Sequence, residues 1–298
     1  MGKNVSKSSL ARANQDRDYH IFEEYAYYLV SEARQKCANH IFKLGGNVYA
    51  FDSTTIDLCL SVFWWAKFRK KKGGIKVHTL YDVETQIPAF FHITEASVHD
   101  SKVMIEIPYE PSSYYIFDRG YNNFKILYKI HQIEAYFVVR AKKNLGYKSI
   151  QWKRRLPKNV LSDASVFLTG FYPKQYYPEP LRLVKYWDEE QEREFTFITN
   201  AMHISALQVA ELYKNRWQVE LFFKWLKQHL KIKRFWGTTE NAVRIQIYAA
   251  ICAYCLVAII QHDMQLNRST YEVLQILSIS LTDKTHLRDL FDKTKISK

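Results

Sequence analysis

Acidic residues are scarce in this sequence. Its 298 residues include 30 Asp and Glu against 43 Lys and Arg, which gives a net charge of +13. A cationic excess of this size favours a polyanionic partner, either nucleic acid or an anionic membrane surface. Hydrophobic residues make up 47% of the chain and aromatic residues 15%. This composition excludes a disordered polymer and is typical of a packed globular protein.

Cysteines and long apolar runs are also few. The chain has four cysteines and no secretory signal, which indicates a reducing, cytoplasmic setting. Cys252 and Cys255 have the C-x2-C spacing of a metal or redox pair, but no second Cys or His pair is near them, so we expect buried small hydrophobic residues. The apolar run around them, residues 245–260, has 16 residues. It is short for a membrane span and predicts a buried core helix.

The positive charge is concentrated in three segments. Residues 58–81 and 135–162 contain several Lys and Arg and no acid, and residues 214–235 contain Glu220 as their one acid. A single cluster of this kind can be a solvated face. Three such clusters in one chain favour contact with a phosphate backbone. No internal repeat or low-complexity linker separates them.

Hydrophobic periodicity predicts a sheet that helices interrupt. Three consecutive strands with short links, an antiparallel meander, are expected at residues 47–60, 75–83 and 87–96. Helices are then expected at 99–107 and 122–133 and strands at 113–117 and 135–141. In the resulting order, β-β-β-α-β-α-β, the strands reached through helices should run parallel to their neighbours.

The flanking segments have other patterns. A polar start precedes a helix at 19–38, and residues 142–200 hold a basic cluster followed by candidate strands at 166–172, 181–187 and 193–199. From Ser205, which is placed to cap a helix, a helical pattern extends to about residue 231 with a possible break at 214–215. Further helices are expected from Thr239, from a capping box at Ser269 and in residues 281–298.

Four polar residues share one face of the helical pattern after Ser205. Tyr213, Arg216, Glu220 and Lys227 have the spacing Y-x2-R-x3-E-x6-K. At 100° per residue they fall in one stripe roughly 60° wide. A carboxylate flanked by two cations and a phenol suits a site that holds a metal ion and a phosphate together.

Two aspartates are candidates for the same site. Asp52 lies within the apolar first strand, and Asp118 follows the fourth. If these strands are adjacent and parallel, both carboxylates lie near the ends of the central strands, the usual place for sites in open α/β sheets. Each aspartate alone could be a turn former. With Glu220 they supply the three carboxylates, from different elements, that metal-dependent phosphoryl transfer requires.

The segments around these residues resemble a DDE transposase of the insertion-sequence-4 family. The matching segments are YAFDSTTIDL around Asp52, GGIKVHTLYD at 73–82, ASVHDSKV at 96–103, YIFDRGY around Asp118, YFVVRAKKN at 136–144, and the whole Y-x2-R-x3-E-x6-K set. The resemblance covers roughly residues 45–260. It implies an α/β fold with a ribonuclease-H-like mixed sheet, helices after it and a β-rich insertion.

The resemblance also implies an activity. Asp52, Asp118 and Glu220 would be the catalytic, metal-binding triad for Mg²⁺ or Mn²⁺, with two ions expected. Tyr213, Arg216 and Lys227 would bind DNA. The implied reaction cuts double-stranded DNA at the element ends and transfers the strand to target DNA. The implied protein is cytoplasmic, associated with the nucleoid when bound, has no membrane partner, and forms a homodimer on paired ends.

Some members form a hairpin intermediate, in which aromatic side chains hold a displaced base. Tyr186, Trp187 and Trp217 are candidates for that role, with core packing as the alternative. Lys76 and His78 share one face of the second strand and either contact DNA or form a structural pair.

The resemblance also predicts a domain organisation. The predicted parts are a remnant of a helical DNA-binding region at 1–45, a ribonuclease-H-like catalytic core at 46–142 and 201–265, a β-rich insertion at 143–200 and a helical tail at 266–298. The short segment before the first strand suggests a truncated copy. A metal-dependent nuclease that does not join strands, and an inactive remnant that only binds DNA, are the alternative functions.

Overall fold

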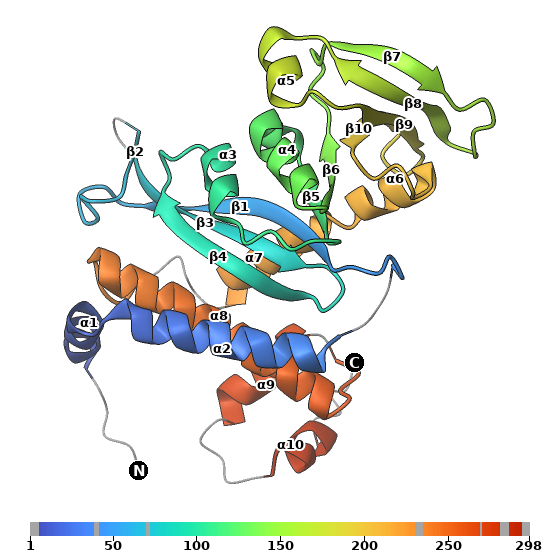
Figure 1. Cartoon of the computed structure of the whole chain (residues 1–298). Helices are drawn as coiled ribbons and strands as arrows, with labels where there is room; N and C mark the ends of the chain where they lie inside the picture. The colour runs from blue at the N-terminus through green and yellow to red at the C-terminus, as the bar shows by residue number, and fades with distance from the viewer. Residues whose placement is uncertain are drawn as a thin grey trace. The chain divides into compact units, whose positions relative to one another are not determined.

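The computed structural model describes residues 6–38, 42–69, 72–229, 235–268, 270–280 and 286–293. The chain divides into two compact units, one comprising His40–Leu221 and the other Met1–Asn39 with Phe222–Lys298. The first unit contains the sheet, and the second is helical (Figure 1). Helix α7 (Trp217–His229) begins in the first unit and ends in the second.

One mixed sheet of ten strands forms the centre of the first unit. The strands are β1 (Val48–Leu58), β2 (Lys67–Arg69), β3 (Lys72–Asp82), β4 (Ile87–Glu95), β5 (Tyr114–Phe117), β6 (Tyr136–Arg140), β7 (Tyr147–Trp152), β8 (Val160–Leu168), β9 (Leu181–Asp188) and β10 (Arg193–Thr199). Their order is β2-β3-β1-β5-β6-β10-β9-β8-β7, and β4 pairs with β3. The chain thus has an α/β fold with a large mixed sheet, consistent with a ribonuclease-H-like transposase fold.

The strand pairing confirms the predicted meander. Strand β3 is antiparallel to both β1 and β4, whereas β5 is parallel to β1 and β6 is parallel to β5. Strands β7 to β10 are antiparallel to one another and join the rest of the sheet through β10 and β6. The β-rich segment after β6 therefore continues the same sheet.

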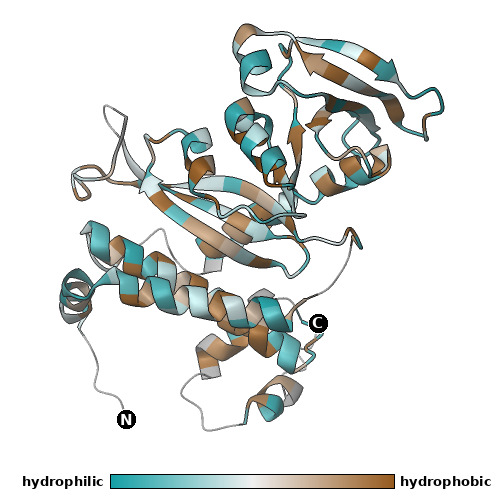
Figure 2. Ribbon diagram, in the orientation of Figure 1, coloured by the Kyte–Doolittle hydropathy of each residue, from teal (hydrophilic) through white to brown (hydrophobic). Residues whose placement is uncertain are grey.

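Short helices lie between these strands. They are α3 (Asp100–Val103), the 3-10 turns η1 (Met104–Glu106) and η2 (Arg119–Tyr121), α4 (Phe124–Gln132), α5 (Phe171–Tyr176) and α6 (Ala206–Lys214). Helix α4 starts where the Asn123 side chain accepts a hydrogen bond from the amide of Ile126, as an N-cap does. Its apolar and polar residues lie on different sides (Figure 2), and the apolar side packs on β6.

Alternation along the central strands determines which face carries the polar residues. Tyr49, Phe51, Tyr115 and Phe117 all lie in the hydrophobic cluster that includes the buried residues of α4. Successive side chains of a strand point to opposite faces of the sheet. The strand residues next to these four aromatic residues therefore face away from α4. Asp52 follows Phe51 and therefore belongs to the other face.

Three sequence predictions in this unit are wrong. The strand expected at 166–172 starts earlier, at Val160, and ends at Leu168, after which Gly170 begins helix α5. Strand β7 was not predicted, because its side chains are almost all exposed and do not alternate in burial. Strand β2 was predicted as a basic connection.

The second unit is helical in the residues described. It contains α1 (Lys7–Asp16), α2 (Tyr19–Lys36), α8 (Glu240–Asp263), α9 (Thr270–Ser280), α10 (Leu287–Lys293) and most of α7. Helix α2 packs along α8, where Lys36 is 2.5 Å from Asp263 and Tyr248 bonds Glu23. The residue expected to cap α9, Ser269, lies outside the described residues.

Helix α8 explains the apolar run of the sequence. Its length and composition would suffice to cross a membrane, but 56% of its most apolar window is buried within the chain. Cys252 and Cys255 are both buried in it as free cysteines, as predicted.

Candidate active site

The two strand aspartates follow paired residues of neighbouring strands, Asp52 in the middle of β1 and Asp118 directly after the end of β5. In the parallel pairing of these strands Phe51 is opposite Phe117, so the next residue on each strand is an aspartate, Asp52 and Asp118. Asp118 also begins the 3-10 turn η2. The predicted adjacency of the first and fourth strands is therefore confirmed, and it brings the two carboxylates to the same place in the sheet.

Arg216 links a strand carboxylate to the helical carboxylate. Its Nη1 donates to Oδ2 of Asp52 at 2.7 Å and its Nη2 donates to Oε1 of Glu220 at 2.6 Å. The side chain of Arg216 is only 17% exposed, whereas that of Glu220 is 56% exposed. The Nε of Arg216 is buried and has no hydrogen-bond partner among the described residues. One guanidinium thus bridges two carboxylates, offsets the charge of one of them and keeps its Nε donor unused.

Tyr213 reaches the other strand aspartate from α6. Its hydroxyl donates to Oδ1 of Asp118 at 2.8 Å, and its ring packs 4.7 Å from the ring of Phe197 on β10. Burial and then the charge of Asp118 raise the pKa of Tyr213 to about 12, so the hydroxyl keeps its proton and acts as a donor. The sheet and α6 together hold this contact in place.

The pKa values of the two aspartates shift in opposite directions. Burial raises the pKa of Asp52, and the charges of Glu220 and Asp118 add to the rise, against the lowering effect of Arg216 and the Ser53 amide. Burial also raises the pKa of Asp118, but the hydrogen bonds from the Arg119 amide and Tyr213 outweigh it, and the pKa is lowered overall. The carboxylates thus act on one another through their charges.

The donor set suits a hard divalent cation. Carboxylate oxygens are the ligands that Mg²⁺ and Mn²⁺ prefer, and like charges held together favour a neutralising cation. Within the described part of the chain, however, no three Asp, Glu, His or Cys side chains are arranged to hold one ion. Arg216 lies between Asp52 and Glu220 instead.

The helical quartet does not lie on one continuous helix, because the break that the sequence allowed at 214–215 is present. Helix α6 ends at Lys214, Arg216 lies in the turn, and Glu220 is on α7. The break occurs because Asn215 uses its side chain: its Nδ2 donates to the carbonyl of Glu211, and its Oδ1 accepts from Gln218. Such bonds compete with helical backbone bonds.

Lys227 is the member of the quartet that lies furthest along α7. It lies seven residues beyond Glu220 on α7, in the part of the helix that belongs to the second compact unit. By helical periodicity it shares a face with Glu220. Its contact with DNA stays a prediction.

A second polar cluster, not predicted, supports Asp52. Tyr121 donates to Oδ1 of Asp52 at 3.4 Å. The neighbour of Asp52, Ser53, donates to Oδ1 of Asp100 at 2.8 Å, and Lys76 lies 3.0 Å from the same oxygen. His78 is fully buried, 3.8 Å from Asp100, and burial lowers its pKa to about 4. Lys76 and His78 thus both lie close to Asp100, and a contact of either with DNA stays a prediction.

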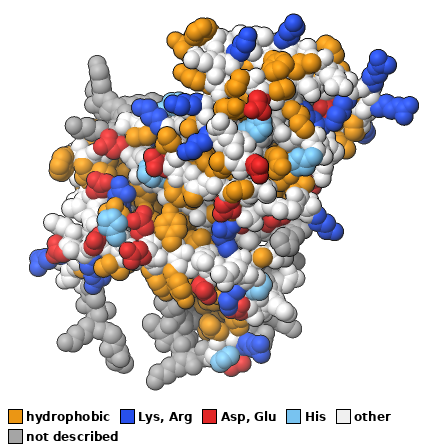
Figure 3. All heavy atoms as spheres, viewed as in Figure 1, with side chains coloured by type: hydrophobic (Ala, Val, Ile, Leu, Met, Phe, Trp, Pro, Cys, Tyr) orange, Lys and Arg blue, Asp and Glu red, His pale blue; other side chains and the backbone are white. Residues whose placement is uncertain are grey.

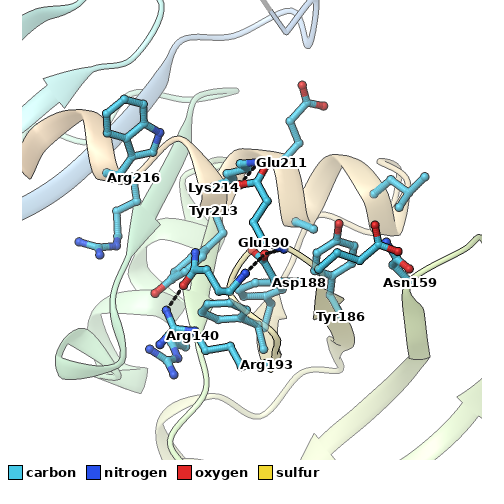
Figure 4. Close-up of a pocket in the computed structure, with 17 residues that line it drawn as sticks. Arg140, Asn159, Tyr186, Asp188, Glu190, Arg193, Glu211, Tyr213, Lys214 and Arg216 are labelled. Atoms are coloured by element: carbon cyan, nitrogen blue, oxygen red, sulfur yellow. Dashed lines mark hydrogen bonds and ion pairs between the residues drawn. The ribbon is translucent and has the colours of Figure 1, made fainter. Parts of the chain in front are cut away.

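A cavity of about 530 Å³ adjoins the site between α6 and strands β9 and β10. Tyr213 and Arg216 lie on the Arg140 side of this cavity, and Tyr186 and Asn159 lie on the opposite side (Figure 4). Trp217 also lines it and is 49% exposed. Core packing, the expected alternative for this tryptophan, is therefore not what the structure shows.

Comparison with known proteins identifies the family. The model of the transposase DDE domain matches residues 43–256. The chain is 37% identical over 246 residues to a protein of Sinorhizobium fredii named as transposase y4zB, and the match covers 80% of this chain and 67% of the relative. It is 27% identical over 249 residues to a transposase named for insertion sequence element IS5377 of Geobacillus stearothermophilus, covering 84% of this chain and 66% of the relative.

A third relative extends the match. The chain is 25% identical over 296 residues to a transposase named for insertion sequence element IS4SA of Synechocystis, covering 95% of this chain and 80% of the relative. The chain spans about two thirds of the length of the first two relatives. Similarity to IS4SA fits the predicted insertion-sequence-4 resemblance, and the family match includes Asp52, Asp118 and Glu220. This chain belongs to the family of DDE transposases.

Proposed function

We propose that the chain cuts DNA strands at the ends of an insertion sequence and joins them to target DNA. The observation that carries this proposal is the link between α6–α7 and the strand carboxylates, in which Arg216 bonds both Asp52 and Glu220 while Tyr213 bonds Asp118. Carboxylates from two parallel strands and a helix, with donors among them, suit phosphoryl transfer. The three relatives are all named as transposases, which supports the same reaction.

In this proposal the residues have separate roles. Asp52, Asp118 and Glu220 would hold two ions of Mg²⁺ or Mn²⁺. When bound, these ions would act as Lewis acids on the attacking and leaving oxygens. Arg216 and Tyr213 would position a DNA phosphate once the metal ions hold the carboxylates, because the donors that bond Asp52, Glu220 and Asp118 would then be available to the phosphate. Lys227 adds a phosphate contact further along α7. Rigid strands under Asp52 and Asp118 keep the two carboxylates in register.

The proposed substrate is double-stranded DNA, both at the element ends and at the target. The net charge of +13 favours such a polyanion. Joining two ends to one target requires two active sites, so we propose a homodimer on paired ends, working in the cytoplasm on the nucleoid. Within each chain we propose residues 46–142 and 201–265 as a ribonuclease-H-like core and 143–200 as its β-rich insertion, with 1–45 and 266–298 as the helical segments beside them.

The test is an assay of strand cleavage and joining. Wild-type protein, the Glu220→Gln variant and a control variant, Glu106→Gln, are incubated with Mg²⁺ or Mn²⁺ and DNA that carries the inverted repeats flanking the coding sequence. Glu106 is an exposed carboxylate at the end of η1 that forms no ion pair among the described residues. We expect cleaved and joined products from the wild type and from Glu106→Gln.

We expect Glu220→Gln to bind the DNA but to give no products. Cleavage without any joined product from the wild type would show a nuclease, and binding without cleavage would show a DNA-binding remnant. Unchanged cleavage by Glu220→Gln would contradict the role of this carboxylate.

A further inference from the structure

A second group of cations lies beside the Asp118 end of the active site. It lines a cavity of about 260 Å³ formed by the turn after β5, the end of β6 with the turn after it, and strands β9 and β10. The charged residues of this lining are Arg119, Arg140, Lys142, Lys143, Lys185 and Glu194. We call it the basic cavity. Five cations thus face a single carboxylate.

Most of this positive charge has no acidic partner. Glu194 lies 3.4 Å from Lys185, so that pair is satisfied. Arg119, Lys142 and Lys143 are exposed and form no ion pair within the ranges that the structure describes. Figure 3 also shows Lys and Arg side chains projecting near the end of the β7–β8 hairpin.

Hydrogen bonds hold the walls of the basic cavity together. Nδ2 of Asn122 donates to the carbonyl of Arg119 at 2.7 Å and to the carbonyl of Arg140 at 2.8 Å. The amide of Ala141 donates to the carbonyl of Thr196 on β10 at 2.8 Å. These bonds tie the turn after β5 to the end of β6 and to β10. The backbone that carries the cations is therefore ordered before any ligand binds, which reduces the entropic cost of binding.

We propose that the basic cavity binds a phosphate of the DNA strand next to the phosphate that reacts at Asp118, a role that rests on the proposed function. Arg119 directly follows Asp118 in the chain, so a strand whose reacting phosphate lies at Asp118 passes the cavity. The lining is mainly flexible cations, with the exposed ring of Tyr147 beside them, and such cations contact the phosphate backbone, which carries no sequence information. Strands β9 and β10 supply one wall, which gives the β-rich segment a part in holding the substrate.

The test measures how DNA binding depends on salt. The double variant Lys142→Gln, Lys143→Gln is compared with the wild type and with Lys125→Gln, Lys129→Gln, which removes the same charge from two exposed lysines of α4 outside the cavity. The probes are a 30-base-pair duplex without element ends and one of its single strands, both in EDTA. Thermal melting checks that all variants fold.

Each lost phosphate contact lowers the slope of log K against log salt by about 0.9 on a duplex and about 0.7 on a single strand. We therefore expect the slope of the cavity variant to be smaller by about 1.8 on the duplex or by about 1.4 on the single strand. We also expect this variant to bind DNA more weakly than the wild type at low salt. A full loss of slope on one probe with almost none on the other identifies which form of the strand occupies the cavity. The α4 variant should keep the slope of the wild type.

Two results would overturn the phosphate site. One is an unchanged slope in the cavity variant, and the other is an equal loss in the α4 variant, which would mean that only net charge matters. If the wild type cuts and joins DNA in either case, the proposed function stands without the basic cavity. If the cavity variant shows the expected loss but the wild type gives no cleavage, the phosphate site stands and the proposed catalytic function fails.

Discussion

Replacing Arg216 by Gln should strengthen the binding of divalent cations in the absence of DNA. The guanidinium lies 2.7 Å from Oδ2 of Asp52 and 2.6 Å from Oε1 of Glu220. A cation that uses these oxygens must first displace it. Arg216 is therefore a competitor of the metal in the free protein, and we expect it to move to a phosphate when metal and DNA bind.

The size of the effect follows from the exposure of the two carboxylates. Asp52 is 22% exposed, so its charge-assisted hydrogen bond counts for most of the effect, about 1.5–3 kcal/mol. Glu220 is 56% exposed, and an exposed pair contributes about 0.2–1 kcal/mol. Glutamine keeps part of the hydrogen bonding, so the net gain is smaller than the sum. We expect binding roughly tenfold to a hundredfold tighter.

The assay is titration with Mn²⁺, followed by electron paramagnetic resonance, without DNA. The control is Arg193→Gln, because Arg193 carries the same charge but lies 4.4 Å over the ring of Phe195 and not on the carboxylates. Unchanged or weaker Mn²⁺ binding by Arg216→Gln would refute the reasoning. An equal gain in the control would show that only the net charge of the protein had changed.

Three predictions concern stability. Because burial lowers the pKa of His78 to about 4, its folded form stays neutral while the unfolded chain gains a proton, so the free energy of unfolding should fall by about 3 kcal/mol from pH 6.5 to 4. Urea unfolding of His78→Gln should show a smaller fall, and an equal fall would contradict this. Asp163→Ala leaves the buried Arg182 without its 2.8 Å partner and should cost about 3–5 kcal/mol in urea unfolding, whereas a loss below 1 kcal/mol would refute the role of the pair. In Gly46→Ala the new Cβ would lie 2.0 Å from the carbonyl oxygen of Ser112, so the melting temperature should drop; an unchanged value would contradict the contact.

The sequence predicted the strand part of the site because local rules decide it. Alternation located β1, and an apolar run that ends in Asp118 located β5. That β1 and β5 are adjacent and parallel was only a condition of the prediction, and the structure meets it. The three carboxylates could be proposed on this basis, before any contact was known.

The remaining features depend on contacts that a sequence pattern does not contain. The sequence indicated a possible break at 214–215, but the side-chain bonds of Asn215 to Glu211 and Gln218 that accompany it are visible only in the structure. Tyr121 and Asp100 support Asp52 and Ser53 from segments more than 40 residues away. The pairing of β10 with β6, which joins the inserted strands to the core sheet, is also a long-range contact.

The most direct test of the carboxylate site compares two variants of strand β1. Asp52→Asn removes a carboxylate that Arg216 bonds, and Asp57→Asn removes an exposed carboxylate five residues later on the same strand. The measurement is the yield of joined DNA in Mg²⁺ on DNA with the element ends. We predict that Asp52→Asn lowers the rate of joining roughly a hundredfold or more, while Asp57→Asn joins at the rate of the wild type. Equal joining by Asp52→Asn and the wild type would contradict the proposed site.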